Sequence, residues 1–90
     1  LELLLERMEL EKSVSDSIET LTGLLEQKNI TVRTEIAEVC VLGDKVWLTQ
    51  VITNLLSNAI KFSPQSSTLI VRVFIEHGFG RFEVTDSGPG

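Results

Sequence analysis

The helix that decides the fold is encoded at residues 44–64 by DKVWLTQVITNLLSNAIKFSP. Asp44 is a residue type that caps a first helical turn, and Ser63-Pro64 ends a helix because the residue before proline avoids the α conformation. Between them apolar residues recur every three or four positions, which predicts a helix to about Phe62 with one face in a core. That predicted core face consists of Leu48, Val51, Ile52, Leu55, Leu56, Ala59 and Ile60.

Segments of alternating polarity on both sides of this helix predict strands. Residues 30–36 alternate along their whole length, and residues 39–42 form a shorter apolar run closed by Gly43. After the helix, residues 68–86 alternate on either side of the sequence HGFG, which is typical of a β-hairpin with a turn at residues 77–80.

The start of the chain predicts helical structure around one short strand. Residues 1–7 have apolar residues at helical spacing and are expected to be the end of a preceding helix or a linker, while residues 8–11 alternate like a strand. Ser13 followed by Asp16 resembles a capping box and predicts a helix that ends near Asn29. Strands and helices in this order predict an α/β fold, an α+β two-layer sandwich in which helices cover one face of a mixed sheet.

The composition describes one small globular domain over residues 8–90. Of the 90 residues 42% are hydrophobic and 23% charged, and the net charge of -5 with scattered basic residues argues against a nucleic-acid partner. No apolar run approaches the roughly 20 residues of a membrane-spanning helix, and no signal peptide is expected. The single Cys40 is expected to be a small buried hydrophobic residue, and a cytoplasmic domain is the natural setting, whether its parent is soluble or membrane-anchored.

Three polar residues stand on one side of the predicted helix at residues 44–62. Asn54, Asn58 and Lys61 lie at i, i+4 and i+7, next to the apolar stripe. Asparagine is a mediocre helix former, so two of them above a lysine suggest a site. Amide oxygens and an ammonium group could serve a magnesium-bound polyphosphate, because Mg²⁺ prefers oxygen ligands. The alternative interpretation is a polar helix edge satisfied by water.

A second candidate site is the sequence VTDSGPG at residues 84–90. The strand is expected to end at Asp86, and Gly88 and Gly90 permit backbone conformations closed to other residues. A carboxylate at a strand end can accept a hydrogen bond from the exocyclic amine of adenine. Guanine presents a carbonyl there, so the same carboxylate would repel it. The alternative interpretation is a simple turn.

These two segments resemble motifs of a known family. Residues 54–64 resemble the N box of sensor histidine kinases, and DSGPG at residues 86–90 resembles their first glycine box. The resemblance extends back through Gly43-Asp44, Leu48 and Gln50-Val51, and so covers nearly the whole chain. It implies the ATP-binding catalytic domain of the histidine kinases, within the gyrase, chaperone and mismatch-repair ATPase superfamily. The implied Bergerat-type fold would be incomplete at its C-terminus, because the family's lid and second glycine box are absent.

The resemblance implies ATP and Mg²⁺ as cofactors and a role for each matching residue. Asn58 would coordinate Mg²⁺ through its amide oxygen, and Lys61 would contact a phosphate. Phe62 would line the adenine pocket, and Asp86 would accept the hydrogen bond from the adenine amine. The two glycines of the box would allow the nucleotide close to the backbone.

Position 54 distinguishes kinases from hydrolases in this resemblance. The related ATPases have a glutamate there that activates water, whereas Asn54 is a poor general base. This implies transfer of the γ-phosphoryl group to a histidine in two-component signal transduction, and it disfavours a related serine kinase. His77 lies in a predicted turn and is not expected to be the acceptor.

The implied partners follow from the same resemblance. They are ATP, a helical domain that carries the phosphoacceptor histidine, a response regulator, and a second copy bound through the preceding helices as a homodimer. The rival hypothesis is a degenerate non-catalytic module of the same fold, used for nucleotide binding or dimerisation.

Overall fold

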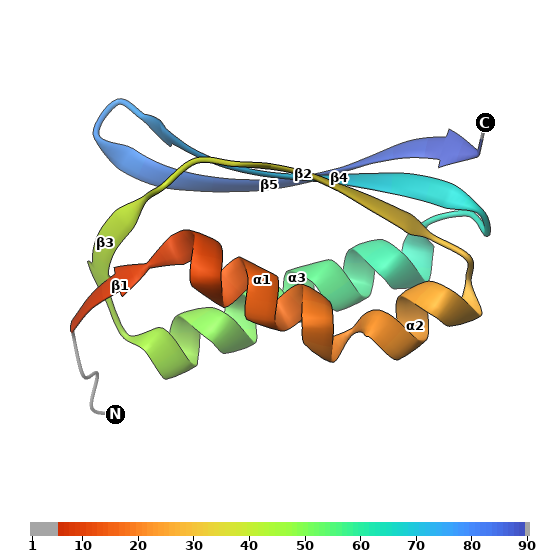
Figure 1. The fold of residues 1–90 in the computed structure, drawn as a ribbon, viewed down its shortest axis with the longest axis horizontal. Helices are drawn as coiled ribbons and strands as arrows, with labels where there is room; N and C mark the ends of the chain where they lie inside the picture. Colours follow the sequence, from red (N-terminus) through yellow and green to blue (C-terminus); the bar gives the residue numbers. More distant parts are fainter. Residues whose placement is uncertain (1–5, 90) are drawn as a thin grey trace.

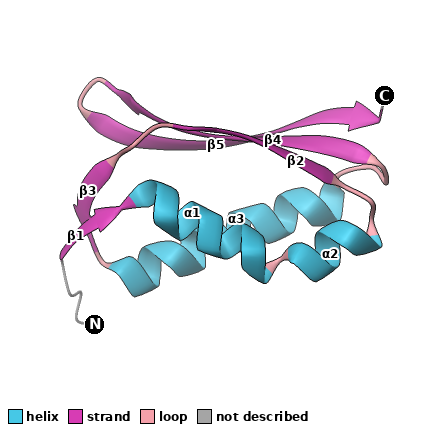
Figure 2. Cartoon of the chain, in the orientation of Figure 1, coloured by secondary structure: helices cyan, strands magenta, loops and turns pink. Residues whose placement is uncertain are grey.

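The structure, a computed structural model, describes residues 6–89, with side chains placed for residues 7–86. Of residues 1–7, expected to be the end of a preceding helix or a linker, residues 1–5 lie outside the described residues, whereas Glu6 and Arg7 belong to a strand. Figures 1 and 2 show the arrangement of the elements. In chain order these are β1 (Glu6–Glu9), α1 (Leu10–Thr20), α2 (Thr22–Gln27), β2 (Thr31–Ile36), β3 (Cys40–Gly43), α3 (Lys45–Phe62), β4 (Ser67–Glu76) and β5 (Phe79–Pro89).

The molecule has two layers, as predicted, with the helices on one face of a mixed sheet (Figure 1). The three-stranded sheet has the order β2-β4-β5, in which β2 and β4 are parallel and β4 and β5 antiparallel. Strands β1 and β3 form a separate antiparallel pair at one end of the helices. No helix in the described part of the chain combines the length and hydropathy needed to cross a membrane.

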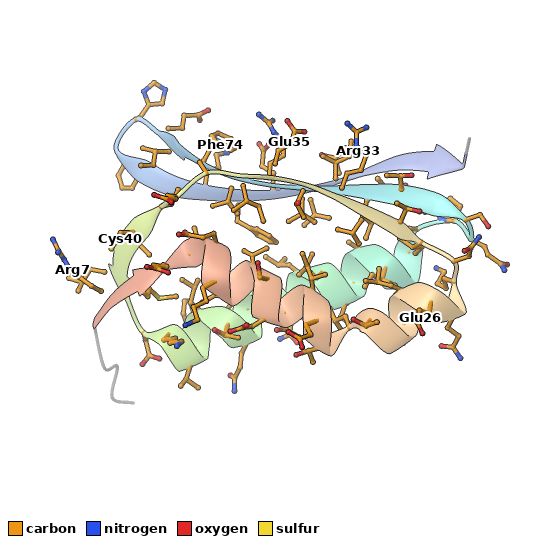
Figure 3. All side chains as sticks on the ribbon, viewed as in Figure 1. Arg7, Glu26, Arg33, Glu35, Cys40 and Phe74 are labelled. Carbon is orange, nitrogen blue, oxygen red and sulfur yellow. The ribbon has the colours of Figure 1, made fainter. Side chains whose placement is uncertain are left out.

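The core lies between the sheet and the helices. Alternate residues of β4 point into it: Leu69, Val71 and Val73 are at most 1% exposed, because a strand sends successive side chains to opposite faces. From the helices come Val14 and the ridge Ile52, Leu56 and Ile60. The opposite face of the sheet carries Arg33, Glu35 and Phe74, which stand away from the helices (Figure 3).

Helix α3 has the bounds and the cap that the sequence predicts. The Asp44 side chain accepts a hydrogen bond from the Trp47 backbone N–H at 3.0 Å, and the helix ends at Phe62. The predicted core face is too wide, because Leu55 is 49% exposed while the adjacent Leu56 is 3% exposed. Leu55 stands on a flank of the helix that the described sheet covers only in part.

Removing the Asp44 cap is expected to lower the free energy of unfolding by about 1 kcal/mol. The first turn of α3 would lose the acceptor that the Trp47 N–H uses at 3.0 Å. Chemical unfolding of the Asp44→Ala and Asp44→Asn variants measures this, and Asn should restore most of the loss because it also caps helices. Asp16→Ala, on the exposed face of α1, is the matched control. An equal loss in that control would contradict the capping role.

The predicted start of the first helix is wrong. The strand β1 occupies Glu6–Glu9, and α1 begins at Leu10 with Glu9 in the capping position but without a side-chain cap. Ser13 lies inside the helix and is 1% exposed, because it faces α3, where its Oγ accepts a hydrogen bond from the Thr49 hydroxyl at 3.4 Å. A small hydroxyl residue that looks like a cap in the sequence therefore serves a helix–helix contact.

The long first helix predicted to reach Asn29 is divided in two at Leu21. The Thr22 hydroxyl donates to the Glu19 carbonyl at 2.9 Å, and the Leu21 N–H bonds back to Ile18 at 3.1 Å. Hydroxyl side chains that bind nearby carbonyls compete with the regular helical pattern, and glycine at position 23 is a weak helix former. Helix α2 follows the break as a separate short element.

The prediction of a buried Cys40 is also wrong, since its thiol is free and exposed. Strand β3 pairs only with β1, and alternate residues of a strand face opposite ways. Val39, just before β3, is 2% exposed, while Leu42 is 68% exposed. The two-stranded sheet has one covered face, and Cys40 lies on the other.

Candidate functional site

A polar flank of α3 carries the residues that the sequence singles out. Asn54, Asn58 and Lys61 are all exposed, as is Phe62 at 79%. The Lys61 ammonium lies 5.8 Å from the centre of the Phe62 ring, within cation–π range. Asn58 and Phe62 follow Leu55 by three and seven positions, so these three share one flank of the helix.

An apolar groove of about 420 Å³ lies beside this flank. It runs between α3, β3 and the beginning of β5, and two of its lining residues are strongly exposed, Leu55 at 49% and Phe79 at 76%. An exposed apolar groove bordered by polar groups is a usual setting for a ligand. Its full lining is Leu10, Val41, Leu48, Val51, Ile52, Leu55, Phe79, Gly80 and Phe82.

Strand β5 presents Asp86 on the side of the sheet that faces the helices. Asp86 is paired with Leu69, and Val84 with Val71, in the antiparallel register of β4 and β5. Directly opposite residues of an antiparallel pair have their side chains on the same face, and Leu69 and Val71 are core residues. The Asp86 carboxylate is exposed, because β5 is the edge of the described sheet.

Helix α3 and strand β5 both lead away from the groove toward their C-terminal ends. Figure 1 shows α3 and β5 running in the same direction, and Leu55 and Phe82 both line the groove. From Leu55 to Phe62 the helix rises roughly 10 Å, and from Phe82 to Asp86 the strand advances roughly 13 Å. Phe62 and Asp86 therefore both lie beyond the groove in the direction in which α3 and β5 run, with Asn58 one turn before Phe62.

The structure does not bring all three predicted polar residues of α3 into the groove. Asn54 borders a hollow with Thr49, Gln50 and Thr53, on the side of α3 that faces α1. Lys61 borders another hollow, which includes Leu24 and Lys28. Of the three, Asn58 shares most closely the flank of Leu55 and Phe62.

The strand predicted to end at Asp86 continues beyond it with a bulge, and the alternative interpretation of a simple turn does not hold through Pro89. Strand β5 continues to Pro89, which pairs with Ser67. From Asp86 to Pro89 the strand advances three residues while its partner β4 goes back only two, from Leu69 to Ser67. The extra residue makes a β-bulge that contains Gly88, a residue type that suits bulges, and bulges are frequent next to active sites. The predicted role of Gly90 lies outside the described residues.

This arrangement fits a nucleotide with its metal ion. Phe62 offers an exposed aromatic ring that could cover a base, and Asp86 offers an exposed carboxylate that could accept a hydrogen bond from one. Asn58 can offer a neutral amide oxygen and Lys61 a cation to phosphates. Among the side chains that the structure describes, residues 7–86, no three of the His, Cys, Asp or Glu type gather as a metal cluster.

Comparison with known proteins identifies the family. Residues 43–90, which are more than half of the chain, match the family described as histidine kinase-, DNA gyrase B- and HSP90-like ATPases. The chain belongs to this family. The matched segment begins just before the α3 cap and contains the polar flank of α3, Asp86 and the bulge of β5.

Known relatives of this ATPase domain place it beside the histidine kinases. It is 35% identical over 89 residues to the sensor protein BceS of Halalkalibacterium halodurans, covering 99% of the chain and 26% of that protein. It is 38% identical over 69 residues to hybrid signal transduction histidine kinase H of Dictyostelium discoideum, covering 73% of the chain and 5% of that protein. The expected resemblance to the ATP-binding domain of sensor histidine kinases is confirmed.

A solved structure confirms the fold of the ATPase domain. The catalytic domain of histidine kinase ThkA superposes with a TM-score of 0.88 at 20% identity, covering 97% of the chain and 61% of that structure. The chain therefore spans about a quarter of the sensor protein BceS and less than two thirds of this catalytic domain.

One residue of the ATPase domain that the sequence does not point to is Lys28. Its ammonium group donates to the carbonyl oxygens of Ile60 at 2.7 Å and Lys61 at 3.0 Å, and also to that of Ser63. Lys28 follows α2 and precedes the strand that begins at Thr31, where a lysine would be expected to be solvated. No spacing in the sequence connects it to the end of α3, so only the folded arrangement reveals the contact.

Proposed function

We propose that this chain binds Mg-ATP and that, in the complete protein, it donates the γ-phosphoryl group to a histidine in two-component signalling. The observation that carries the proposal is the match of residues 43–90 to this ATPase family, over a segment that carries Asn58 and Phe62 on an exposed flank of α3 and Asp86 on β5. The family supports the use of ATP, and the histidine kinase relatives support the kinase class.

Each residue has a role that its position supports. The adenine amine donates to Asp86, and the ring stacks against or beside Phe62, whose 79% exposure leaves its face available. Asn58 holds Mg²⁺ through its amide oxygen, and the ion, when bound, neutralises phosphate charge. Lys61 reaches a phosphate from the next turn of α3. Gly88 lets the backbone of the bulge approach the nucleotide.

Phosphoryl transfer of this kind depends on positioning and charge neutralisation more than on covalent chemistry. Asn54 offers no strong base to activate water. An incoming histidine brings its own nucleophilic nitrogen, so the site favours transfer to a protein side chain over hydrolysis. We propose that the acceptor lies in a separate helical domain, since His77 lies in the two-residue turn between β4 and β5 and not on a helix.

The complete protein, incubated with γ-labelled Mg-ATP, is expected to label itself through a phosphorus–nitrogen bond and to release phosphate only slowly. The label should be lost in acid and kept in alkali, as phosphohistidine is. Acid and alkali treatment of the labelled protein, with a parallel assay of free phosphate, measures both properties.

Two results would contradict this assignment. Acid-stable label on serine or threonine would identify a different kinase class, and rapid ATP turnover without labelled protein would identify a hydrolase. The Asp86→Asn variant, treated in the same way, is the control that connects any labelling to this nucleotide site.

The partners of the complete protein are proposed from its relatives. Histidine kinase ShkA has been solved in complex with AMPPNP, and histidine kinase ThkA in complex with the response regulator TrrA. We propose corresponding partners here: ATP, a phosphoacceptor helical domain, a response regulator and a second copy of the chain. We also propose that residues 8–90 form the first part of a cytoplasmic catalytic domain and that the complete protein is itself phosphorylated. The rival hypothesis of a degenerate binding module is not favoured, since no specific observation supports it.

A further inference from the structure

The C-terminal end of α3 is capped by a side chain from a distant part of the chain. Lys28 is half-buried, and its ammonium group donates to the carbonyls of Ile60 at 2.7 Å, of Lys61 at 3.0 Å and of the C-cap residue Ser63. An ammonium group has three donors, and all three are used. The contact joins residues 32 to 35 positions apart, so it depends on the tertiary fold.

These contacts satisfy groups that a helix cannot satisfy by itself. The last four carbonyls of an α-helix have no intrahelical partner and carry the negative end of the helix dipole. In α3 the Ala59 carbonyl accepts from Ser63, through its N–H at 3.0 Å and its hydroxyl at 2.6 Å. Lys28 donates hydrogen bonds to the next two carbonyls, those of Ile60 and Lys61. It also adds a full positive charge at this end of the helix, where a cation is favourable.

The backbone around Lys28 is held to the loop after α3 as well. The Lys28 carbonyl accepts from the Ser66 N–H at 2.9 Å, and the Asn29 side-chain amide donates to the Ser66 hydroxyl at 3.2 Å. Asn29 and Ser66 both have positive φ, of 55° and 65°, so each loop turns sharply at the contact. These hydrogen bonds hold the backbone of Lys28 to the loop after α3, and they therefore limit the positions that its ammonium group can reach.

We propose that Lys28 is a positioning residue for the phosphates of a bound nucleotide. The inference rests on the proposed function, in which Asn58 and Lys61 in the last turns of α3 serve the metal ion and the phosphates. Lys28 positions the phosphates in two ways. It fixes the turn from which Lys61 projects, and its charge offsets the negative carbonyls that phosphates would otherwise meet at this helix end.

This role makes a prediction that depends on the charge of the ligand. Replacing Lys28 with Met keeps an unbranched apolar stem and removes the ammonium group, so the helix end regains its negative potential. The binding of Mg-ATP should then fall by about tenfold, on the scale of a partly buried charge at a helix terminus. The binding of adenosine, which has no phosphates, should change by less than about twofold by the same reasoning. Lys28→Arg, which restores the charge, should recover most of the Mg-ATP affinity.

The experiment is calorimetric titration of the complete protein with Mg-ATP, Mg-ADP and adenosine. Lys45→Met is the matched control, because it removes one lysine charge at the opposite end of the same helix, where Lys45 is the first residue of α3 and is exposed. That control should leave the ratio of ATP to adenosine affinity unchanged. Circular dichroism at the titration temperature verifies that each variant is folded. If Lys28→Met does not fold, the same comparison is made between Lys28→Gln and Lys28→Arg.

The outcomes are distinct. A selective loss of Mg-ATP affinity that Arg rescues supports the proposal. Equal losses for ATP and adenosine, or unchanged affinities for both, overturn it and reduce Lys28 to a structural cap. A wild-type protein that binds no Mg-ATP contradicts the proposed function itself, whereas failure of this inference alone appears only in the comparison of variants.

Discussion

Replacing Asn58 with Ala is expected to weaken Mg-ATP binding by on the order of 100-fold while changing metal-free ATP binding by no more than about twofold. Asn58 is exposed on the flank of α3 that leads to the far end of the groove, so the substitution removes an oxygen ligand without disturbing the core. The amide oxygen acts through the ion rather than on the nucleotide directly, and for that reason the loss should require the metal.

Calorimetric titration of ATP with excess Mg²⁺ and again with a chelator measures the two affinities. Gln50→Ala is the matched control, since it removes the same chemical group from an exposed position two turns earlier on the same helix. The control should leave both affinities unchanged. Equal losses with and without metal in Asn58→Ala would show that this amide does not serve a metal ion.

Replacing Asp86 with Asn is expected to reduce ATP affinity by about 1–3 kcal/mol, the range for leaving a buried polar group without its partner. An amide that turns its NH₂ group toward the adenine amine meets donor with donor. Turned the other way, it offers only a neutral acceptor. The repulsion of the guanine carbonyl also disappears with the carboxylate, so the preference for ATP over GTP should shrink at the same time.

Competition between ATP and GTP for the wild type and the variant measures this preference. Glu83→Gln makes the same change of carboxylate to amide on the same strand, but on the opposite face, where Glu83 pairs with Arg72 at 3.2 Å. Its nucleotide preference should remain that of the wild type. A wild-type protein that binds ATP and GTP equally would show that Asp86 does not recognise the base.

The elements with a strong repeating pattern are the ones that the sequence predicts well. Helix α3 has an apolar stripe, a cap at Asp44 and a stop at Ser63, and the structure reproduces the cap, the stop and the buried centre of the stripe at Ile52, Leu56 and Ile60. The hairpin of β4 and β5 also follows its alternation, with a two-residue turn at His77 and Gly78, where φ is positive at both positions. In these segments local preference and tertiary packing favour the same conformation.

The incorrect predictions concern residues whose role or exposure depends on which other elements pack against them. Ser13 is a good cap by residue type, but in the folded chain it is a buried contact to α3. Cys40 and Leu55 are apolar and fit predicted buried positions, yet they are exposed because β3 has one partner strand and because the described sheet ends at β5. Periodicity identifies a face of an element, but it does not say whether anything covers that face.

The candidate site shows the same division. Residue types and spacing identify Asn58 and Asp86 as candidates, but the common direction of α3 and β5, which carries both residues the same way past the groove, is a property of the fold. The bulge at Gly88 requires the register of β4, and the cap by Lys28 requires the loop after α2 to lie against the end of α3. None of these relations can be predicted from the local sequence pattern of a single element.

The small sheet of β1 and β3 has a mechanical consequence. Its ladder pairs Glu6 with Gly43, the residue immediately before the cap of α3. A force applied to the chain at Glu6 is therefore transmitted to the start of α3 through the backbone hydrogen bonds between β1 and β3, and it does not have to pass through α1, α2 and β2. Strand β1 is thus coupled directly to the beginning of the helix that carries Asn58. This connection is far shorter than the chain segment that joins β1 to α3.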